Sequence, residues 1–498
     1  MSPWIDGRGT RGVVVYYGGN DAPFRAVDSK TGKELWSFVA PEHHAKLRRL
    51  YLNSPDITYP NVDDPNPNAR KDYFFDGSSG IFQNADNSKV WIYPTMRRGG
   101  RMLYAFDVTG TTPVIKWSFG CPNQGDDVGC SPSTASGIGQ TWSGANVGFA
   151  KGFNSGNDPI IVMGGGYDPC EDADTQAPTC TVGTEKGAKV FVLNADTGAI
   201  IKTFNTDRAV PGDVTLVDRD FDGKADHAYV GDTGGNLYRI DFVDPATVAP
   251  RAPGSWTITK IASTTGSGRK FLFGPAALAL TNQVIVALGS GDRERPLITN
   301  YPYTTPVQNR FYTFFDAFSA TNVNLDGSSM TNFTTNTDCN SAVASGQHGW
   351  FMDLNAGTGE QTVTSSVIFG GTVFWSTNRP VASQSSCSTN LGEARGYAVN
   401  LLNASGVIGT GGLCGGSRSG AFTGGGLPPS PVIGVVPVKT DTNGDGVVDA
   451  NDGSRNIPVC IGCIDLTTGG GSPIGAQQPP VPIKQKRSRV YWYPQGDK

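Results

Sequence analysis

A short phrase that recurs along the chain is the feature that most constrains its fold. Each copy is a strand rich in aromatic residues that ends in Asp or Asn, often followed by Thr-Gly. The seven copies are Phe24–Gly32, Leu103–Asp107, Val190–Gly198, Leu237–Asp241, Phe311–Asp316, Trp350–Asp353 and Gly396–Asn400. A strand-sized phrase repeated this often indicates a series of similar small sheets.

The residues around these copies supply the rest of a repeating unit. Several copies follow an apolar segment that ends in glycines, at residues 13–19, 160–166 and 284–289. Several precede a segment with a tryptophan, namely Trp36, Trp117 and Trp256. We expect the glycine-ended strand to be the inner one, the phrase to form the second strand and its hairpin turn, and the tryptophan to lie on the third. The fold class is predicted to be all-β, a β-propeller of about seven blades.

The copies are unevenly spaced, from 37 residues between Asp316 and Asp353 to 87 between Asp107 and Asn194, so the excess must leave as loops. The candidate insertions are Glu42–Arg70, Gly120–Gly139, Asp168–Lys186 and Ser319–Gly346. The 66 glycines and only 17% charged residues fit a β-rich fold with many tight turns. We expect a single propeller domain over residues 1–498, with a calcium-loop and cysteine insertion at 437–463.

The nine cysteines indicate disulfides rather than zinc, because the chain has only four histidines and none stands in a zinc-ligand spacing. We expect Cys121 to pair with Cys130, Cys170 with Cys180, Cys460 with Cys463 and Cys387 with Cys414, which leaves Cys339 odd. Such loop staples point to an oxidising compartment and an exported protein. Because the first residues do not resemble a signal peptide, the sequence is interpreted as a mature or truncated fragment that lacks an N-terminal region.

An acidic loop at Asp218–Asp226 predicts a calcium site. The pattern D-x-D-x-D-G-x-x-D places side-chain oxygens at alternate positions around a bend at Gly223, as a hard cation with many oxygen ligands requires. The expected ligands are Asp218, Asp220, Asp222, the Lys224 carbonyl and Asp226. The alternative is a solvated acidic turn, but four carboxylates in nine residues would repel one another without a cation. Position 12 of the loop is Tyr229 and a strand follows, so this is not a full EF-hand.

A second calcium loop is predicted at 441–452, around Gly446. Its expected ligands are Asp441, Asn443, Asp445, the Val447 carbonyl, Asp449 and Asp452. The alternative is a plain Asn-Gly/Asp-Gly turn. This loop rests on its spacing alone.

The chain lacks the sequence motifs of several classes of enzyme. The chain shows no paired carboxylates for hydrolysis, no G-x-S-x-G elbow and no P-loop, so no catalytic residue is expected. The Cys460–Cys463 spacing also suits a redox pair, although a structural disulfide fits better after Pro458. The net charge of −4 argues against nucleic-acid binding, and no apolar stretch could span a membrane. The basic, aromatic segment 484–493 is predicted to be a last strand that closes the ring.

The chain resembles the C-terminal domain of the PilY/PilC-type proteins associated with type IV pili. The resemblance rests on the calcium stretch and on motifs spread in order along the chain, at 76–78, 97–107, 231–241, 391–398, 428–432 and 489–492. It implies a modified seven-bladed propeller at the bacterial surface, pilus tip or outer membrane, reached through the periplasm. It also assigns calcium to the ligands named for the first loop.

The resemblance further implies a function without enzymatic activity. Calcium occupancy would regulate pilus extension against retraction, with roles in twitching motility and adhesion, and the partners would be minor pilins at the pilus tip and a host-cell or abiotic surface. An Arg-Gly-Asp motif is absent, so integrin binding is not expected. Two alternatives stay open. One is a quinoprotein dehydrogenase propeller, because the segment Asp28–Trp36 resembles the tryptophan-bearing repeat of that fold, although the likeness extends to the fold only. The other is a lectin-like binding propeller.

Overall fold

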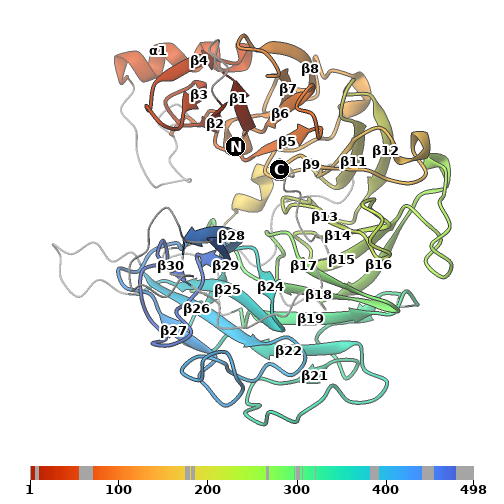
Figure 1. Cartoon of the computed structure of the whole chain (residues 1–498), viewed down its shortest axis with the longest axis vertical. Helices are drawn as coiled ribbons and strands as arrows, with labels where there is room; N and C mark the ends of the chain where they lie inside the picture. Colours follow the sequence, from red (N-terminus) through yellow and green to blue (C-terminus); the bar gives the residue numbers. More distant parts are fainter. Residues whose placement is uncertain are drawn as a thin grey trace. The chain divides into compact units, whose positions relative to one another are not determined.

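The computed structural model describes residues 2–5, 11–54, 71–173, 180, 185–264, 268–296, 298, 303–304, 307–319, 321–381, 392–439 and 454–477. These residues fall into two units, unit 1 up to Lys260 and unit 2 from Ile261 (Figure 1). Strands form nearly all the regular structure of both units, as the sequence predicts. That residues 1–498 form one domain stays a prediction.

Unit 1 contains four sheets of strands that follow one another in the chain. The first consists of β1 (Ser2–Ile5), β2 (Arg11–Gly18), β3 (Phe24–Asp28) and β4 (Glu34–Phe38). The second consists of β5 (Ser79–Gln83), β6 (Val90–Pro94), β7 (Arg101–Asp107) and β8 (Val114–Cys121). The third consists of β9 (Asn146–Gly148), β10 (Ile160–Gly164), β11 (Lys189–Asn194) and β12 (Ile200–Asn205). The fourth consists of β13 (Thr215–Val217), β14 (His227–Gly231), β15 (Asn236–Asp241) and β16 (Thr257–Ser263), and the boundary between the two units falls within β16.

Helical structure is confined to the connections. The α-helix α1 (His44–Leu52) follows β4. Single 3-10 turns are found at Pro41–His43, Arg97–Gly99, Ser133–Ala135, Asn154–Gly156, Pro169–Asp172 and Pro253–Ser255. The first strands of the second, third and fourth sheets adjoin one another, β5 beside β9 and β9 beside β13. The connection after β9 therefore lies next to the connection after β13, and Phe149 and Ala225 are joined by a backbone hydrogen bond.

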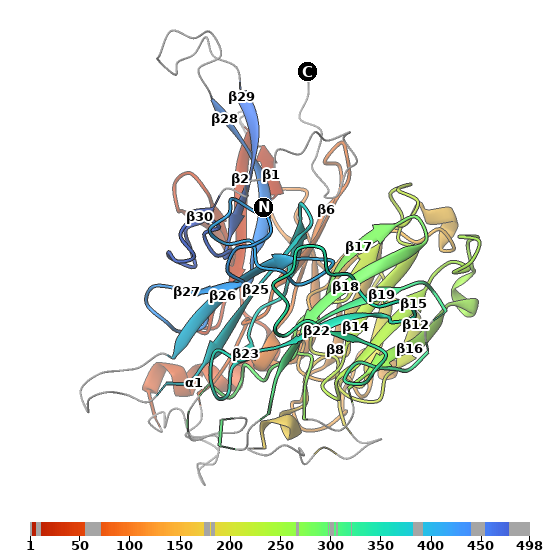
Figure 2. The ribbon, with the colours of Figure 1, turned by 90° about the horizontal axis from the view of Figure 1, so that it is seen from below.

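Unit 2 continues with three sheets. One consists of β17 (Ala276–Leu280), β18 (Gln283–Gly289), β19 (Arg310–Asp316), β22 (Gly349–Asp353) and β21 (Thr331–Asn332). In the next, β23 (Gln361–Thr362) and β24 (Val367–Phe369) both pair with β25 (Thr372–Arg379), followed by β26 (Glu393–Asn400) and β27 (Ser419–Ala421). In the last, β28 (Val432–Lys439) and β29 (Ser454–Ile461) run side by side and β30 (Ala476–Gln477) pairs with β29 (Figure 2). The short β20 (Val323–Asn324) pairs with the last two residues of β16.

The repeated phrase takes the same place in six sheets. Six of its seven copies form the third strand, as β3, β7, β11, β15, β19 and β26. The glycine-ended strands β2, β10 and β18 are therefore second in their sheets, and the prediction that they are innermost is wrong. The closing Asp or Asn caps a turn: Oδ1 of Asn194, for example, accepts hydrogen bonds from the backbone of Asp196 (2.8 Å) and Thr197 (3.1 Å).

The copy at Trp350–Asp353 was assigned wrongly to a blade of its own, because it forms β22 beside β19 in one sheet. Its tryptophan explains the error. Trp350 Nε1 donates to the carbonyl of Leu401, just after β26 of the following sheet (2.9 Å), as Trp117 of β8 donates to Asp196 just after β11 (3.1 Å). β22 is thus a tryptophan-bearing strand that docks onto the next sheet. Among the described residues there are seven sheets, and β28–β30 carries no copy; the number of blades stays a prediction.

The core of each unit lies between neighbouring sheets. In unit 1, fully buried apolar residues from β10 and β11 pack against residues of β14 and β15, and a second set packs against β6 and β7. In unit 2, Trp375 of β25 is stacked between Phe311 (3.7 Å between ring centroids) and Tyr397 (4.7 Å). Burial of such aromatic area, rather than any helix, holds the sheets together.

Three predicted disulfides are confirmed: Cys121–Cys130, Cys170–Cys180 and Cys460–Cys463. The prediction that Cys414 pairs with Cys387 is wrong, because Cys414 is bonded to Cys339, 75 residues away in the sequence. The insertion that holds Cys339 is brought to the turn after β26, where Asn403 Nδ2 donates to the Cys339 carbonyl at 2.8 Å. Cys387 lies outside the described residues, as does the segment 484–493 that was predicted to close the ring.

Candidate metal centre

The predicted calcium loop connects two paired strands of the fourth sheet. Val217, the last residue of β13, lies opposite His227, the first of β14, so the residues between them form the turn of a hairpin. The backbone N–H of Asp226 donates to the Val217 carbonyl at 2.8 Å and closes the base of this turn. Gly223 has φ +87°, as the predicted bend requires, and Phe221 adopts φ +60°. The sequence does not predict the second left-handed residue.

Three of the predicted ligands come together. One carboxylate oxygen from each of Asp218, Asp220 and Asp226 lies within 4.8 Å of the other two. Asp226 is fully buried, and its Oδ2 accepts a hydrogen bond from the Arg219 N–H at 2.8 Å. Its Oδ1 accepts no backbone hydrogen bond among the described residues and lies 3.1 Å from the Lys151 ammonium nitrogen. A buried carboxylate oxygen beside two further carboxylates fits a hard divalent cation such as Ca²⁺.

Hydrogen bonds between the loop's carboxylates and its backbone hold the turn. Asp222 Oδ1 accepts from the Lys224 N–H at 3.0 Å, and Asp218 Oδ2 accepts from the Gly223 N–H at 2.7 Å. The Lys224 side chain turns away from the carboxylates, since its Nζ donates to the Ser155 carbonyl at 3.1 Å. The backbone carbonyl is therefore the group that Lys224 can offer to a cation, as the sequence predicts.

A lysine that the sequence does not single out reaches into this loop. Lys151 follows β9, and its Nζ lies 2.5 Å from Asp220 Oδ2, 3.1 Å from Asp226 Oδ1 and 3.5 Å from Asp222 Oδ2. Burial acts to lower the pKa of Lys151, but its contacts with the carboxylates of Asp220 and Asp226 raise the pKa above its ordinary value. Burial likewise acts to raise the pKa of Asp220, but the contact with Lys151 lowers it. At Asp218, burial and the neighbouring carboxylates together raise the pKa.

Buried polar contacts within the fourth sheet and a hydrogen bond to the segment after β9 hold the hairpin in place. Behind the loop, His227 Nδ1 lies 2.7 Å from Asp241 Oδ1, which also accepts from Arg239 Nε at 2.8 Å. On its flank, the Ala225 N–H donates to the Phe149 carbonyl at 2.7 Å. These contacts fix both ends of the loop, so that its carboxylates project from a rigid base.

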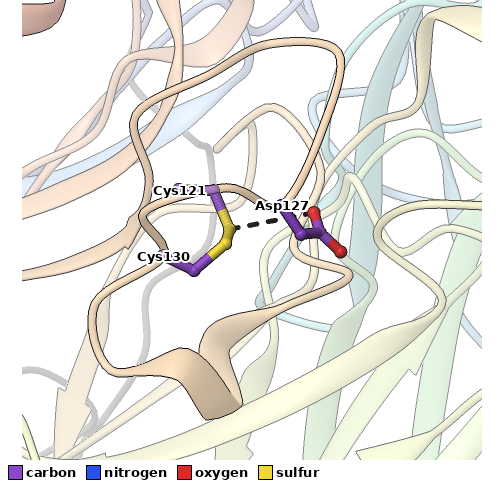
Figure 3. A group of neighbouring side chains, drawn as sticks. All are labelled: Cys121, Asp127 and Cys130. Atoms are coloured by element: carbon purple, nitrogen blue, oxygen red, sulfur yellow. Dashed lines mark hydrogen bonds between the residues drawn. A yellow bond between two sulfur atoms is a disulfide. The ribbon is translucent and has the colours of Figure 1, made fainter.

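Two other groups of residues resemble metal sites in composition but differ in chemistry. Sγ of Cys121 lies 3.9 Å from Asp127 Oδ1, yet its sulfur is bonded to Cys130 and offers no thiolate (Figure 3). Asp127 instead pairs with the buried guanidinium of Arg101, which also donates to the Ile138 carbonyl at 2.7 Å. The second group contains the Cys170–Cys180 disulfide and Glu185, which is bonded to Arg208 at 2.6 Å. Both groups are therefore structural.

Other predictions can be tested only in part. The second calcium loop at 441–452 lies outside the described residues, although β28 and β29 on its two sides are paired. Along the part of the chain that the structure describes, no helix has the length and apolar character needed to cross a membrane.

Comparison with known proteins finds similar proteins of one family. Residues 68–291 match the family model of the PilY1 beta-propeller domain. The type IV pilus biogenesis factor PilY1 of Pseudomonas aeruginosa strain UCBPP-PA14 is 28% identical over 258 residues, which cover 49% of this chain and 19% of that protein. A PilY1 homolog of Xylella fastidiosa strain Temecula1 is 28% identical over 244 residues, covering 48% of this chain and 16% of that protein. The matched region thus spans less than a fifth of the length of these relatives.

The fold agrees with this match. The crystal structure of the Pseudomonas aeruginosa PilY1 C-terminal domain aligns over 91% of both chains with a TM-score of 0.60 and 17% sequence identity. Together with the sheets described above, this likeness confirms the predicted β-propeller fold. Over residues 68–291 the chain therefore resembles the PilY-type family, and its fold is the β-propeller that the sequence predicts.

Proposed function

We propose that this chain is the calcium-binding β-propeller of a type IV pilus biogenesis factor. The observation that carries the calcium site is the buried carboxylate of Asp226, which lies within 4.8 Å of carboxylate oxygens of both Asp218 and Asp220. The pilus role is supported by the relatives, which are named type IV pilus biogenesis factors.

The proposed oxygen ligands come from five residues of the loop. Asp218, Asp220 and Asp226 supply the clustered oxygens, and Asp222 and the Lys224 carbonyl complete the set. Bound Ca²⁺ supplies positive charge that neutralises neighbouring carboxylates. Because the loop is bonded to residues 149–155 of the adjacent connection, a change in the loop alters the surface that both segments present. This shared surface is suited to bind another protein in a calcium-dependent way.

In the cell, we assign the chain a binding role without catalysis. Calcium occupancy would set the balance between pilus extension and retraction, and with it twitching motility and adhesion. Minor pilins at the pilus tip and a host-cell or abiotic surface are the proposed partners. This role places the protein at the bacterial surface, pilus tip or outer membrane after export through the periplasm.

Calorimetric titration of the chelator-treated chain with Ca²⁺ tests the site. We expect Asp226→Asn, which keeps the shape of the side chain but removes its charge, to weaken binding by at least about tenfold. Asp196→Asn is the matched control, because Asp196 is also paired with a lysine, at 2.6 Å from Lys116, but lies in another turn. Equal affinities for wild type and Asp226→Asn would refute the assignment. Asp445→Ala, examined in the same way, reports on the second predicted loop.

The pilus role is tested by placing Asp226→Asn and Asp196→Asn in the full-length protein in its host bacterium. Surface piliation and twitching should change with Asp226→Asn alone, and equal behaviour of both variants would contradict calcium control. The alternatives predict different results. A quinoprotein dehydrogenase would show the absorbance of a bound cofactor, and a lectin-like propeller would bind sugars in a glycan screen.

A further inference from the structure

Lys151 is a cation that the protein itself delivers to the carboxylate loop. Its Nζ contacts Asp220, Asp226 and Asp222 at 2.5, 3.1 and 3.5 Å, and the side chain is only 11% exposed. It comes from the connection between β9 and β10, 67 positions or more from the loop in sequence. One ammonium group therefore serves three carboxylates.

The backbone on both sides of Lys151 is held in place. On its N-terminal side, Phe149 accepts the 2.7 Å hydrogen bond from Ala225, and Ala150 and Ala225 form a parallel bridge. On its C-terminal side, Gly152 packs so closely that a Cβ would lie 1.6 Å from the Arg251 carbonyl oxygen. Since the backbone cannot withdraw, only rotation of the four-carbon stem can remove the ammonium group from the loop.

The ammonium group and a divalent cation cannot contact the same oxygens together. Ca²⁺ lies about 2.3–2.6 Å from its oxygen ligands, and Lys151 Nζ already lies 2.5 Å from Asp220 and 3.1 Å from Asp226. A cation bound to both oxygens would occupy the position of Nζ, and two positive centres that close repel strongly. Binding must therefore displace Lys151.

We propose that Lys151 is a built-in competitor of the calcium ion, which it replaces among the carboxylates when calcium is scarce. This inference rests on the proposed calcium site and adds its regulation. The competition has two consequences. The affinity for Ca²⁺ is lower than the carboxylates alone would give, and at low calcium the Lys151 ammonium group compensates part of the charge of the loop. Such a site responds to calcium in the extracellular range instead of being permanently filled.

The test uses Lys151→Met, which keeps an unbranched side chain one heavy atom shorter and removes the charge. Calorimetry on the chelator-treated chain should show Ca²⁺ affinity raised about tenfold or more, while the melting temperature in chelator falls by about 2–4 °C. Lys116→Met is the matched control, because Lys116 pairs with Asp196 at 2.6 Å with a similar exposure of 17%. It should leave the calcium affinity unchanged.

A second measurement on the wild-type chain does not depend on how the variant folds. Acetylation of Lys151 by a soluble acylating reagent, followed by mass spectrometry, should become faster when Ca²⁺ displaces the side chain into solvent, while acetylation of Lys116 should not change. Affinity that is unchanged or lower in Lys151→Met, or acetylation that is unaffected by Ca²⁺, would overturn the competition and leave the calcium site standing. If neither wild type nor Lys151→Met binds Ca²⁺, the calcium site itself fails, and with it the competition.

Discussion

Acidification should weaken the fold through one buried histidine, His43, in the turn before α1. Its Nε2 lies 3.2 Å from the Gly99 carbonyl, and its ring packs edge-on against Phe74 and Phe75. Nδ1 has no partner among the described residues, and Lys46 donates to the same Gly99 carbonyl at 3.1 Å. Burial, reinforced by the charge of Lys46, lowers the pKa of His43 from 6.5 to about 4.

The size and direction of the effect follow from that pKa. Above pH 6.5 the imidazole is neutral in both the folded and the unfolded chain. Between pH 6.5 and about 4 the unfolded chain takes up a proton that the folded chain does not, so stability falls as the pH falls. At about 1.4 kcal/mol for each pKa unit, His43 removes about 3 kcal/mol of stability by pH 4, and no more below it.

The substitution His43→Gln isolates the contribution of His43 to the pH dependence of stability. The glutamine amide can still donate a hydrogen bond to the Gly99 carbonyl but cannot take up a proton. Urea unfolding of both proteins at several pH values, at constant calcium, gives the difference in their free energies of unfolding. We expect the variant to gain about 3 kcal/mol relative to wild type between pH 7 and pH 4. Parallel curves, or a His43 imidazole that titrates near 6.5 in nuclear magnetic resonance spectra, would refute the reasoning.

Three further predictions concern the core and the cysteines of unit 2. Replacing both Cys339 and Cys414 by Ser removes a cross-link over 75 residues and should cost about 4 kcal/mol, seen as a lower urea midpoint without reductant. Trp375→Ala should cost about 3–5 kcal/mol in the same assay, because its ring is stacked on both faces. Thiol titration of the denatured, unreduced chain should detect one thiol, that of Cys387, because eight of the nine cysteines form the four disulfides; any other count contradicts the pairing.

Local sequence patterns predicted the parts of the structure that depend on local physics. The phrase ending in Asp or Asn marks the third strand of six sheets because its last side chain bonds to the backbone of the next turn, as Asn194 does. The spacing of Asp218, Asp220 and Asp226 likewise predicted a cluster that forms around one bend. The three confirmed disulfides also join neighbours in sequence, the widest across 10 residues.

The errors arise where contacts are long-range. The phrase at Trp350 has the same aromatic and acidic residues as a third strand, and only its docking onto Leu401 of the next sheet shows that it belongs beside β19. Cys339 was left odd because its partner is 75 residues away, on a loop that meets it through Asn403. Nothing near either residue in the sequence encodes these partners.

Long-range contacts also limit the prediction of metal affinity from the sequence of an acidic loop. Spacing gives the oxygen donors, and by that measure alone the loop at 441–452 has a more complete set than the loop at Asp218. Affinity, however, depends on how much more strongly the carboxylates bind Ca²⁺ than they bind the group that contacts them without it. At the first loop that group is Lys151, from the connection after β9. Two loops with equal ligand patterns can therefore respond to different calcium concentrations. If Lys151→Met tightens binding, the working range of this site is set by a residue outside the motif that identifies it.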